Sequence, residues 1–195
     1  MNVVVMEPRS PLTATLFGRR AAVQALLLVA GVLLLTVSAK IRIPLWPVPM
    51  TMQTFVVLVV AMAYGLHLGT ATLCAYLAAG ALGAPVFAGT PEQGIGVPYM
   101  LGPTGGYLLG FVLATVLLGK LAGRGWDRKL WTSLAAMTLG HVLILACGVA
   151  WLAVSLGIER AVAAGLTPFV LATVIKTLMA AAVLPPAWTL LARLR

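Results

Sequence analysis

Long apolar runs, separated by short polar segments, follow one another along the chain from residue 21 onward. A helix that crosses the hydrocarbon core of a membrane needs about 20 mostly apolar residues. Six runs reach about this length, at residues 21–39, 50–66, 68–88, 104–122, 131–156 and 169–192. No strand-like alternation passes through them, and hydrocarbon cannot satisfy unpaired backbone groups. We therefore predict an all-α membrane protein with six transmembrane helices.

The composition supports a lipid environment. Of the 195 residues, 62% are hydrophobic and only 9% are charged, whereas a soluble domain has about 25% charged residues. The chain is too apolar for intrinsic disorder. With only Cys74 and Cys147, both inside apolar runs, it also lacks the cysteines of a disulfide scaffold.

The net charge of +9 follows the positive-inside pattern of membrane proteins. One side of the predicted spans carries nine basic residues: Arg9, Arg19, Arg20, Lys120, Arg124, Arg128, Lys129, Arg193 and Arg195. The other side has only Lys40, Arg42 and Arg160. This asymmetry predicts that both termini are cytoplasmic and that the protein lies in the cytoplasmic (inner) membrane. No basic cluster is interleaved with aromatic residues, so the charge does not indicate nucleic-acid binding.

The N-terminal segment differs from the rest of the chain. Residues 1–20 contain Pro8 and Pro11 and predict a short cytoplasmic tail that is mobile rather than folded. The apolar run that follows is longer than the roughly 7–15 residues of a cleaved leader, so we interpret it as a membrane anchor. Residues 21–195 then form a single six-helix membrane domain.

Lys176 is a basic residue inside the sixth apolar run, seven positions beyond Phe169. A charged side chain near the bilayer centre costs about 2.5–3.5 kcal/mol unless it finds a partner or water. Its neighbours on the same helical face are small or polar or, in one case, methionine: Ala172, Thr173, Met179 and Ala180. Leu171, Val174 and Leu178 occupy the opposite face. We predict that Lys176 faces the bundle; the alternative is a lysine that extends to the outer headgroups.

The segment 89–103 is too rich in glycine and proline to be helical and is predicted to fold back over the bundle as an outer loop. Glu92 and Tyr99 within it, with Thr104 and Tyr107 at the start of the next helix, could supply hydrogen-bonding groups to a pocket that opens outward. Alternatively, Glu92 is a solvated loop charge and Tyr99 belongs to the interfacial aromatic belt.

Two further segments carry candidate contacts. In residues 40–54, three prolines prevent a simple helical hairpin, and Gln53 follows at the next helix start. Gln53 could bind a ligand, although a capping or interhelical role fits equally well. Ala21 and Ala25 form a small-x-x-x-small pair that permits close approach by another helix.

Residues for catalysis or metal binding do not assemble in this sequence. His67 falls in a short turn and His141 in an apolar run, without cysteine or carboxylate at a metal-ligand spacing, so we interpret both as structural. There is no G-x-S-x-G nucleophile motif and no phosphate-binding glycine loop. We expect a protein that is not an enzyme and that carries neither a metal nor a cofactor.

Three segments resemble one known family. They are IRIPLWPVPMTMQT at 41–54, GALGAPVFAGTPEQGIG at 80–96 continued by GPTGGYLLGF at 102–111, and TPFVLATVIK at 167–176. Most of residues 21–190 is similar to the BioY biotin-transport proteins, the substrate-binding S components of energy-coupling-factor (ECF) transporters. The glycine- and proline-rich segment that ends in GPTGGYL is the most specific of the three.

The resemblance implies a six-helix S-component fold that captures biotin with high affinity, in an outward-facing pocket, for uptake. It also implies a transmembrane coupling protein and two ATPase subunits as partners, while a homo-oligomer stays open. Small residues of the first helix contact the coupling protein in that family, and here they correspond to Ala21 and Ala25. The family's sixth-helix lysine corresponds to Lys176, which would oppose the carboxylate of biotin or hydrogen-bond its polar head.

One position departs from the family pattern. Many relatives have Gly-Asp where this chain has Ala172-Thr173, so a carboxylate acceptor is missing. The ureido ring of biotin has two N–H donors, which need acceptors. Our hypothesis assigns a larger part of this task to Glu92 or Gln53. An S component for another small vitamin is the first alternative, followed by an intramembrane enzyme and a scaffold subunit without a ligand.

Overall fold

The structure is a computed structural model that describes residues 10–18 and 20–193. Arg9, Arg19 and Arg195, which enter the topology prediction, lie outside the described residues, as does the rest of 1–9. The elements are α1 (Leu12–Phe17), α2 (Ala21–Lys40), β1 (Arg42–Ile43), β2 (Met50–Thr51), α3 (Gln53–Ala81), α4 (Gly96–Met100), α5 (Gly105–Gly123), α6 (Leu130–Leu156), α7 (Ile158–Gly165), the 3₁₀ turn η1 (Thr167–Phe169) and α8 (Val170–Arg193).

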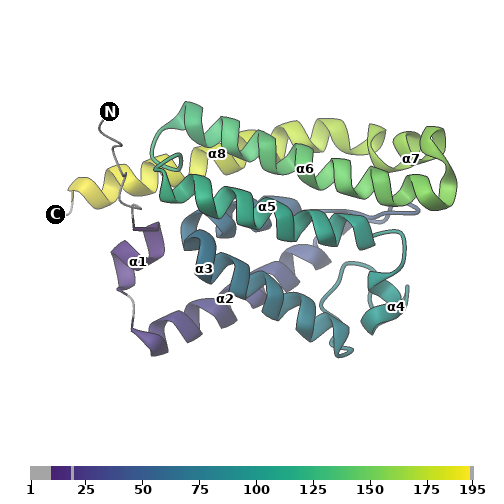
Figure 1. The fold of residues 1–195 in the computed structure, drawn as a ribbon, viewed down its shortest axis with the longest axis horizontal. Coiled ribbons are helices and arrows are strands. Elements are labelled where there is room, and N and C mark those ends of the chain that lie inside the picture. Colours follow the sequence, from purple (N-terminus) through teal and green to yellow (C-terminus); the bar gives the residue numbers. More distant parts are fainter. Residues whose placement is uncertain (1–9, 19, 194–195) are drawn as a thin grey trace, which may run out of the picture.

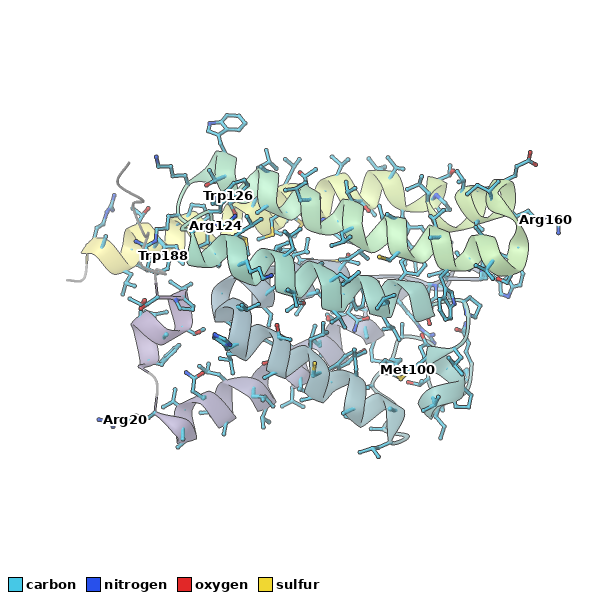
Figure 2. The ribbon with its side chains drawn as sticks, in the orientation of Figure 1. Arg20, Met100, Arg124, Trp126, Arg160 and Trp188 are labelled. Atoms are coloured by element: carbon cyan, nitrogen blue, oxygen red, sulfur yellow. The ribbon has the colours of Figure 1, made fainter. Side chains whose placement is uncertain are left out.

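The long helices form one bundle around α5 (Figure 1). In that view α6 and α8 run along one side, α5 along the middle, and α2 with part of α3 along the other side. Five helical stretches of the described chain are long and apolar enough to cross a membrane: α2, α3, α5, α6 and the stretch Ile158–Arg193. Arg20 and Arg124 lie at one end of the bundle, whereas Arg160 lies at the opposite end (Figure 2).

Helix α3 is broken at Gly65. This residue has φ +73° and ψ −175°, a conformation that L side chains rarely adopt. The chain doubles back there, since a Cβ placed on Gly69 would lie only 3.4 Å from the Cα of Ala61. The arms 53–64 and 66–81 therefore meet close to the boundary predicted between the runs 50–66 and 68–88.

Replacement of Gly65 by alanine is expected to destabilise the fold. A Cβ there would lie 2.5 Å from Cγ of Pro11, and the positive-φ, extended-ψ conformation of this residue costs a non-glycine residue about 1–3 kcal/mol. We expect Gly65→Ala to lower the midpoint of thermal unfolding in detergent by several degrees. Gly123→Ala is the matched control, because open space surrounds Gly123; equal midpoints for the two variants would contradict the role of Gly65.

Two predicted helix boundaries and one predicted loop are wrong. The helix predicted to begin at residue 50 begins at Gln53, because Met50–Thr51 pairs as a strand with Arg42–Ile43. The helix predicted to reach residue 88 ends at Ala81, and turns follow it. The loop 89–103 contains the short helix α4, which tolerates Pro98 because the first helical turn needs no donor from that residue.

Two further short helices, α1 and α7, lie where the sequence predicted none. Leu12 and Thr13 of α1 are buried against α3, and the Thr13 hydroxyl donates to the carbonyl of Ala63 at 3.2 Å. This part of the expected mobile tail is therefore structured. Helix α7 follows Gly157, whose φ of +79° ends α6, and it fills the segment expected to be a loop.

Candidate ligand-binding site

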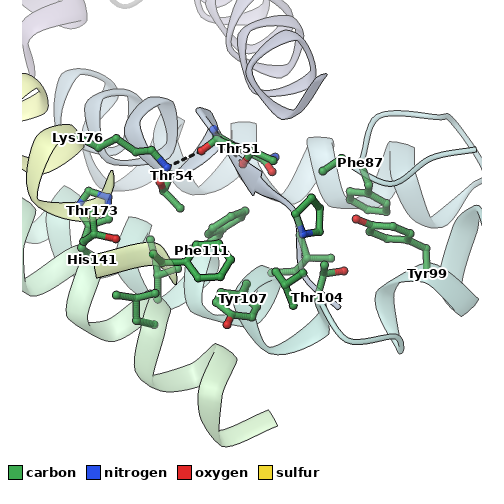
Figure 3. A pocket seen from close by; sticks show the side chains of 18 residues that line it. Thr51, Thr54, Phe87, Tyr99, Thr104, Tyr107, Phe111, His141, Thr173 and Lys176 are labelled. Atoms are coloured by element: carbon green, nitrogen blue, oxygen red, sulfur yellow. Dashed lines mark hydrogen bonds between the residues drawn. The ribbon is translucent and has the colours of Figure 1, made fainter. Parts of the chain in front are cut away.

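A cavity of about 620 Å³, counted with its open mouth, lies between α3, α5, α6, α8, β2 and the 82–95 loop. Eighteen residues line it, mostly apolar and aromatic: Val48, Pro49, Thr51, Gln53, Thr54, Phe87, Ala88, Tyr99, Thr104, Tyr107, Leu108, Phe111, His141, Ile144, Leu145, Phe169, Thr173 and Lys176 (Figure 3).

Most of the candidate residues meet in this pocket. Six of the seven line it although they come from four separate segments: Gln53, Tyr99, Thr104, Tyr107, Thr173 and Lys176. Glu92 does not line it. The structure therefore brings together what the sequence placed on separate helices and loops.

Lys176 points into the pocket and is only 7% exposed. Its Nζ donates to the backbone carbonyl of Thr51 at 2.6 Å and to the Thr54 hydroxyl at 3.5 Å. An ammonium has three N–H donors, so a donor stays available to a ligand. The alternative in which this lysine extends to the headgroups is wrong.

The helical face of Lys176 is as predicted in all but one position. Leu171, Val174 and Leu178 are exposed on the opposite face, as expected. Met179 is also exposed, at 47%, so its assignment to the face of Lys176 is wrong. A residue three positions away on a helix is offset by roughly 60° around the axis, which is enough to turn this side chain away from the pocket.

Two pairs of aromatic rings line the pocket. The rings of Phe87 and Tyr99 stack with centroids 5.0 Å apart, and those of Tyr107 and Phe169 lie 6.2 Å apart. The Tyr99 hydroxyl accepts from the backbone N–H of Gly89 at 3.1 Å, and the Tyr107 hydroxyl donates to the carbonyl of Gly165 at 2.6 Å. Both hydroxyls thus bind the backbone, and the rings provide apolar surface. Tyr99 is buried and is not part of an exposed interfacial belt.

Gln53 lies on the pocket wall in a short hydrogen-bond chain. Its Nε2 donates to the Tyr76 hydroxyl at 2.6 Å, and that hydroxyl donates to the carbonyl of Val86 at 3.1 Å. One of the two N–H donors of the amide is therefore committed, which leaves the second N–H and the amide oxygen for other partners. Both the interhelical and the ligand-binding interpretation of Gln53 fit this geometry.

Glu92 lies on the surface beside Arg42. Their side chains are 63% and 26% exposed and form an ion pair at 3.2 Å. A hydrogen bond from its own backbone N–H, and then the Arg42 guanidinium, hold the pKa of the Glu92 carboxyl below its ordinary value. The carboxylate keeps its charge until the pH falls through this lowered pKa, so the pair and its small stabilising effect are present at neutral pH. Glu92 therefore lies outside the pocket lining, in the surface position of a solvated loop charge.

A basic residue holds the 82–95 loop beside the pocket. Lys40, at the end of α2, donates from Nζ to the carbonyls of Phe87 and Thr90, each at 2.8 Å, and to the Thr90 hydroxyl at 3.1 Å. Phe87 is also a pocket residue. The position of this wall therefore depends on the ammonium of Lys40.

Two kinds of lining residue were not predicted from the sequence. Phe111, Ile144 and Phe169 are apolar side chains in apolar runs, and nothing in the sequence separates a pocket wall from a packed core. His141 could have been recognised as a candidate from the sequence, because a polar side chain inside a membrane span needs a partner or a cavity. It is 2% exposed and lies on the pocket wall beside Thr173 (Figure 3).

The fold and the pocket define a multi-pass helical membrane protein with a buried small-molecule site. The sequence profile of the BioY family matches residues 10–193. The chain belongs to the BioY family.

Individual relatives agree with this assignment. The chain is 39% identical to the probable biotin transporter BioY of Pyrococcus horikoshii over 145 residues, which are 74% of this chain and 83% of that protein. It is 40% identical to the biotin transporter BioY of Thermotoga maritima over 149 residues, which are 76% of this chain and 85% of that protein.

A solved structure shows the same fold. It is the crystal structure of the S-component for biotin from an ECF-type ABC transporter, which aligns with a TM-score of 0.72 over 88% of this chain and 95% of that chain. The two sequences are 20% identical in this alignment, so the similarity supports the S-component fold.

Proposed function

We propose that this protein captures biotin with high affinity and serves its uptake across the cytoplasmic membrane as the substrate-binding subunit of an ECF transporter. The observation that carries the proposal is the buried ammonium of Lys176 in the pocket of a BioY-family chain. Two relatives in that family are named as biotin transporters or probable biotin transporters. The chain binds its ligand and is not an enzyme, so ATP hydrolysis belongs to separate subunits.

The pocket suits the chemistry of biotin. Its aromatic and aliphatic walls fit the thioether ring and the aliphatic chain. Its polar groups, among them the buried Lys176, Gln53 and His141 and the partly buried Thr173, can pair with the ureido group or the carboxylate. Apolar burial then supplies affinity, and the few polar groups supply specificity.

Titration calorimetry of the purified protein with biotin tests this function. We expect saturable binding of biotin that an excess of riboflavin or thiamine does not displace. Displacement by another vitamin, with no heat from biotin, would instead support an S component for that vitamin.

For the topology, we propose six membrane crossings with both termini in the cytoplasm, the two arms of α3 counting as separate helices. The basic residues Arg20 and Arg124 at one end of the bundle support it, with Arg160 at the other. Single cysteines placed at these positions, in a chain without Cys74 and Cys147, can be labelled in intact cells. A membrane-impermeant maleimide should reach only the cysteine at position 160.

The partner contact is proposed at the start of α2, where Ala21 and Ala25 are exposed. Small side chains there leave room for a helix of a coupling protein. We expect Ala25→Trp to reduce ATP-dependent biotin uptake by the assembled complex at least about tenfold, with biotin binding unchanged, because about 1.4 kcal/mol of lost contact suffices for a tenfold change. Leu26→Trp is the control on an adjacent exposed position. Equal uptake by both variants would show that the coupling protein does not contact Ala25.

A further inference from the structure

His141 of α6 makes a hydrogen bond that fixes the position of its proton. The Thr177 hydroxyl lies 2.7 Å from the backbone carbonyl of Thr173, which can only accept, so the single hydroxyl proton lies between these two oxygens. The same hydroxyl lies 2.8 Å from Nδ1 of His141. It must therefore accept from Nδ1–H, and the imidazole proton is on Nδ1.

The other ring nitrogen of His141 is then an acceptor. Nε2 is buried and has no hydrogen-bond partner among the described residues. A charged imidazolium without a partner at this buried nitrogen would cost far more than a neutral ring, so we treat Nε2 as an unprotonated lone pair. A buried acceptor left unsatisfied is unfavourable, and this one belongs to a side chain of the pocket wall.

Lys176 and His141 together offer a ligand both hydrogen-bond donors and an acceptor. Figure 3 places His141, Thr173 and Lys176 together at the same end of the pocket. Lys176 offers N–H donors, and His141 offers one acceptor. A carboxylate has only acceptors at neutral pH, so it cannot hydrogen-bond to the unprotonated Nε2 and would be repelled by its lone pair.

We propose that Nε2 of His141 accepts a hydrogen bond from a ureido N–H of biotin, while Nζ of Lys176 donates to the ureido carbonyl oxygen. The ureido ring then lies between α6 and α8, and the carboxylate extends away from Lys176. This inference rests on the proposed function, because it takes biotin as the ligand. It also gives His141 the acceptor role that the sequence suggested for Glu92 or Gln53.

Calorimetry with matched ligands tests the pairing. We compare the parent protein and His141→Phe, which keeps a flat ring and removes the acceptor, with biotin and with analogues methylated on each ureido nitrogen in turn. We expect His141→Phe to weaken biotin about tenfold to a hundredfold. For one of the two analogues the parent and the variant should bind equally, since that methyl group removes the same hydrogen bond. His141→Gln, which offers an amide oxygen, should recover part of the affinity for biotin.

The outcomes separate this inference from the proposed function. If the parent binds biotin but methylation weakens the parent and His141→Phe by the same factor at both nitrogens, His141 is not the acceptor. If the parent binds no biotin, the proposed function itself is wrong.

A second measurement needs no variant. In protein labelled with ¹⁵N-histidine, bound biotin should move the Nε2 resonance of His141 in the direction of a hydrogen-bonded nitrogen while Nδ1 stays protonated. An unchanged Nε2 resonance in the saturated complex would overturn the proposal.

Discussion

Lys176→Met is expected to weaken biotin binding about thirtyfold to a few thousandfold in calorimetry of the purified protein. Methionine has a similar length but no donor, so the buried ligand oxygen loses its partner. Removal of one member of a buried, charge-assisted hydrogen bond costs about 2–5 kcal/mol, and each 1.4 kcal/mol is a factor of ten in affinity. The carbonyl of Thr51, now 2.6 Å from Nζ, also loses its donor.

Ile175→Met is the matched control for this prediction. Ile175 is the preceding residue of α8 and is 50% exposed on the outer surface of the bundle, so its replacement should leave the affinity unchanged. Biotinamide, which lacks the carboxylate charge, separates the two poses. If Lys176 binds the ureido carbonyl, Lys176→Met should weaken biotinamide by the same factor as biotin. A folded Lys176→Met protein with the affinity of the parent would remove this residue from the site.

Lys40→Met is expected to speed the dissociation of biotin about tenfold or more. The ammonium of Lys40 holds the carbonyls of Phe87 and Thr90 at 2.8 Å, and Phe87 is a pocket residue that stacks on Tyr99. A hydrogen bond to a charged group contributes about 1.5–3 kcal/mol, so its loss should let the loop open more often. A chase of bound radiolabelled biotin from protein in nanodiscs measures the rate.

The exposed ion pair in the same region provides the control for Lys40. Arg42→Gln removes the contact with Glu92, and exposed pairs of this kind contribute little to stability. Its release rate should therefore stay within a few-fold of the parent. Equal rates for Lys40→Met and the parent would mean that the loop keeps its place without the ammonium.

The apolar runs predicted the long helices because hydrocarbon permits few other backbone structures. They could not predict β1 and β2, whose pairing joins residues on either side of three prolines. Nor could they predict α1 and α7, which lie outside the long runs. The reversal at Gly65 was found to within two residues, since a short polar interruption at His67 marks it.

The site was predicted best where a polar group stands inside an apolar run. Lys176 is such a residue, because the cost of an unpaired charge restricts where it can point. Glu92 was misplaced for the opposite reason: a carboxylate in an aqueous loop can turn toward solvent at little cost. His141 was interpreted as structural because no other metal-ligating residue lies at a suitable spacing, whereas its acceptor role depends on a ring proton that the contact with Thr177 places on Nδ1.

The bond from Lys176 to Thr51 joins the last helix to the β-hairpin near the start of the chain, across the floor of the site. A bound ligand that contacts both Lys176 and Thr51 would link two segments that lie far apart in the sequence. Ligand binding would then stabilise the whole fold. At a free ligand concentration a thousand times the dissociation constant, binding adds about 4 kcal/mol to the free energy of unfolding. The filled carrier should therefore outlast the empty one during extraction from the membrane.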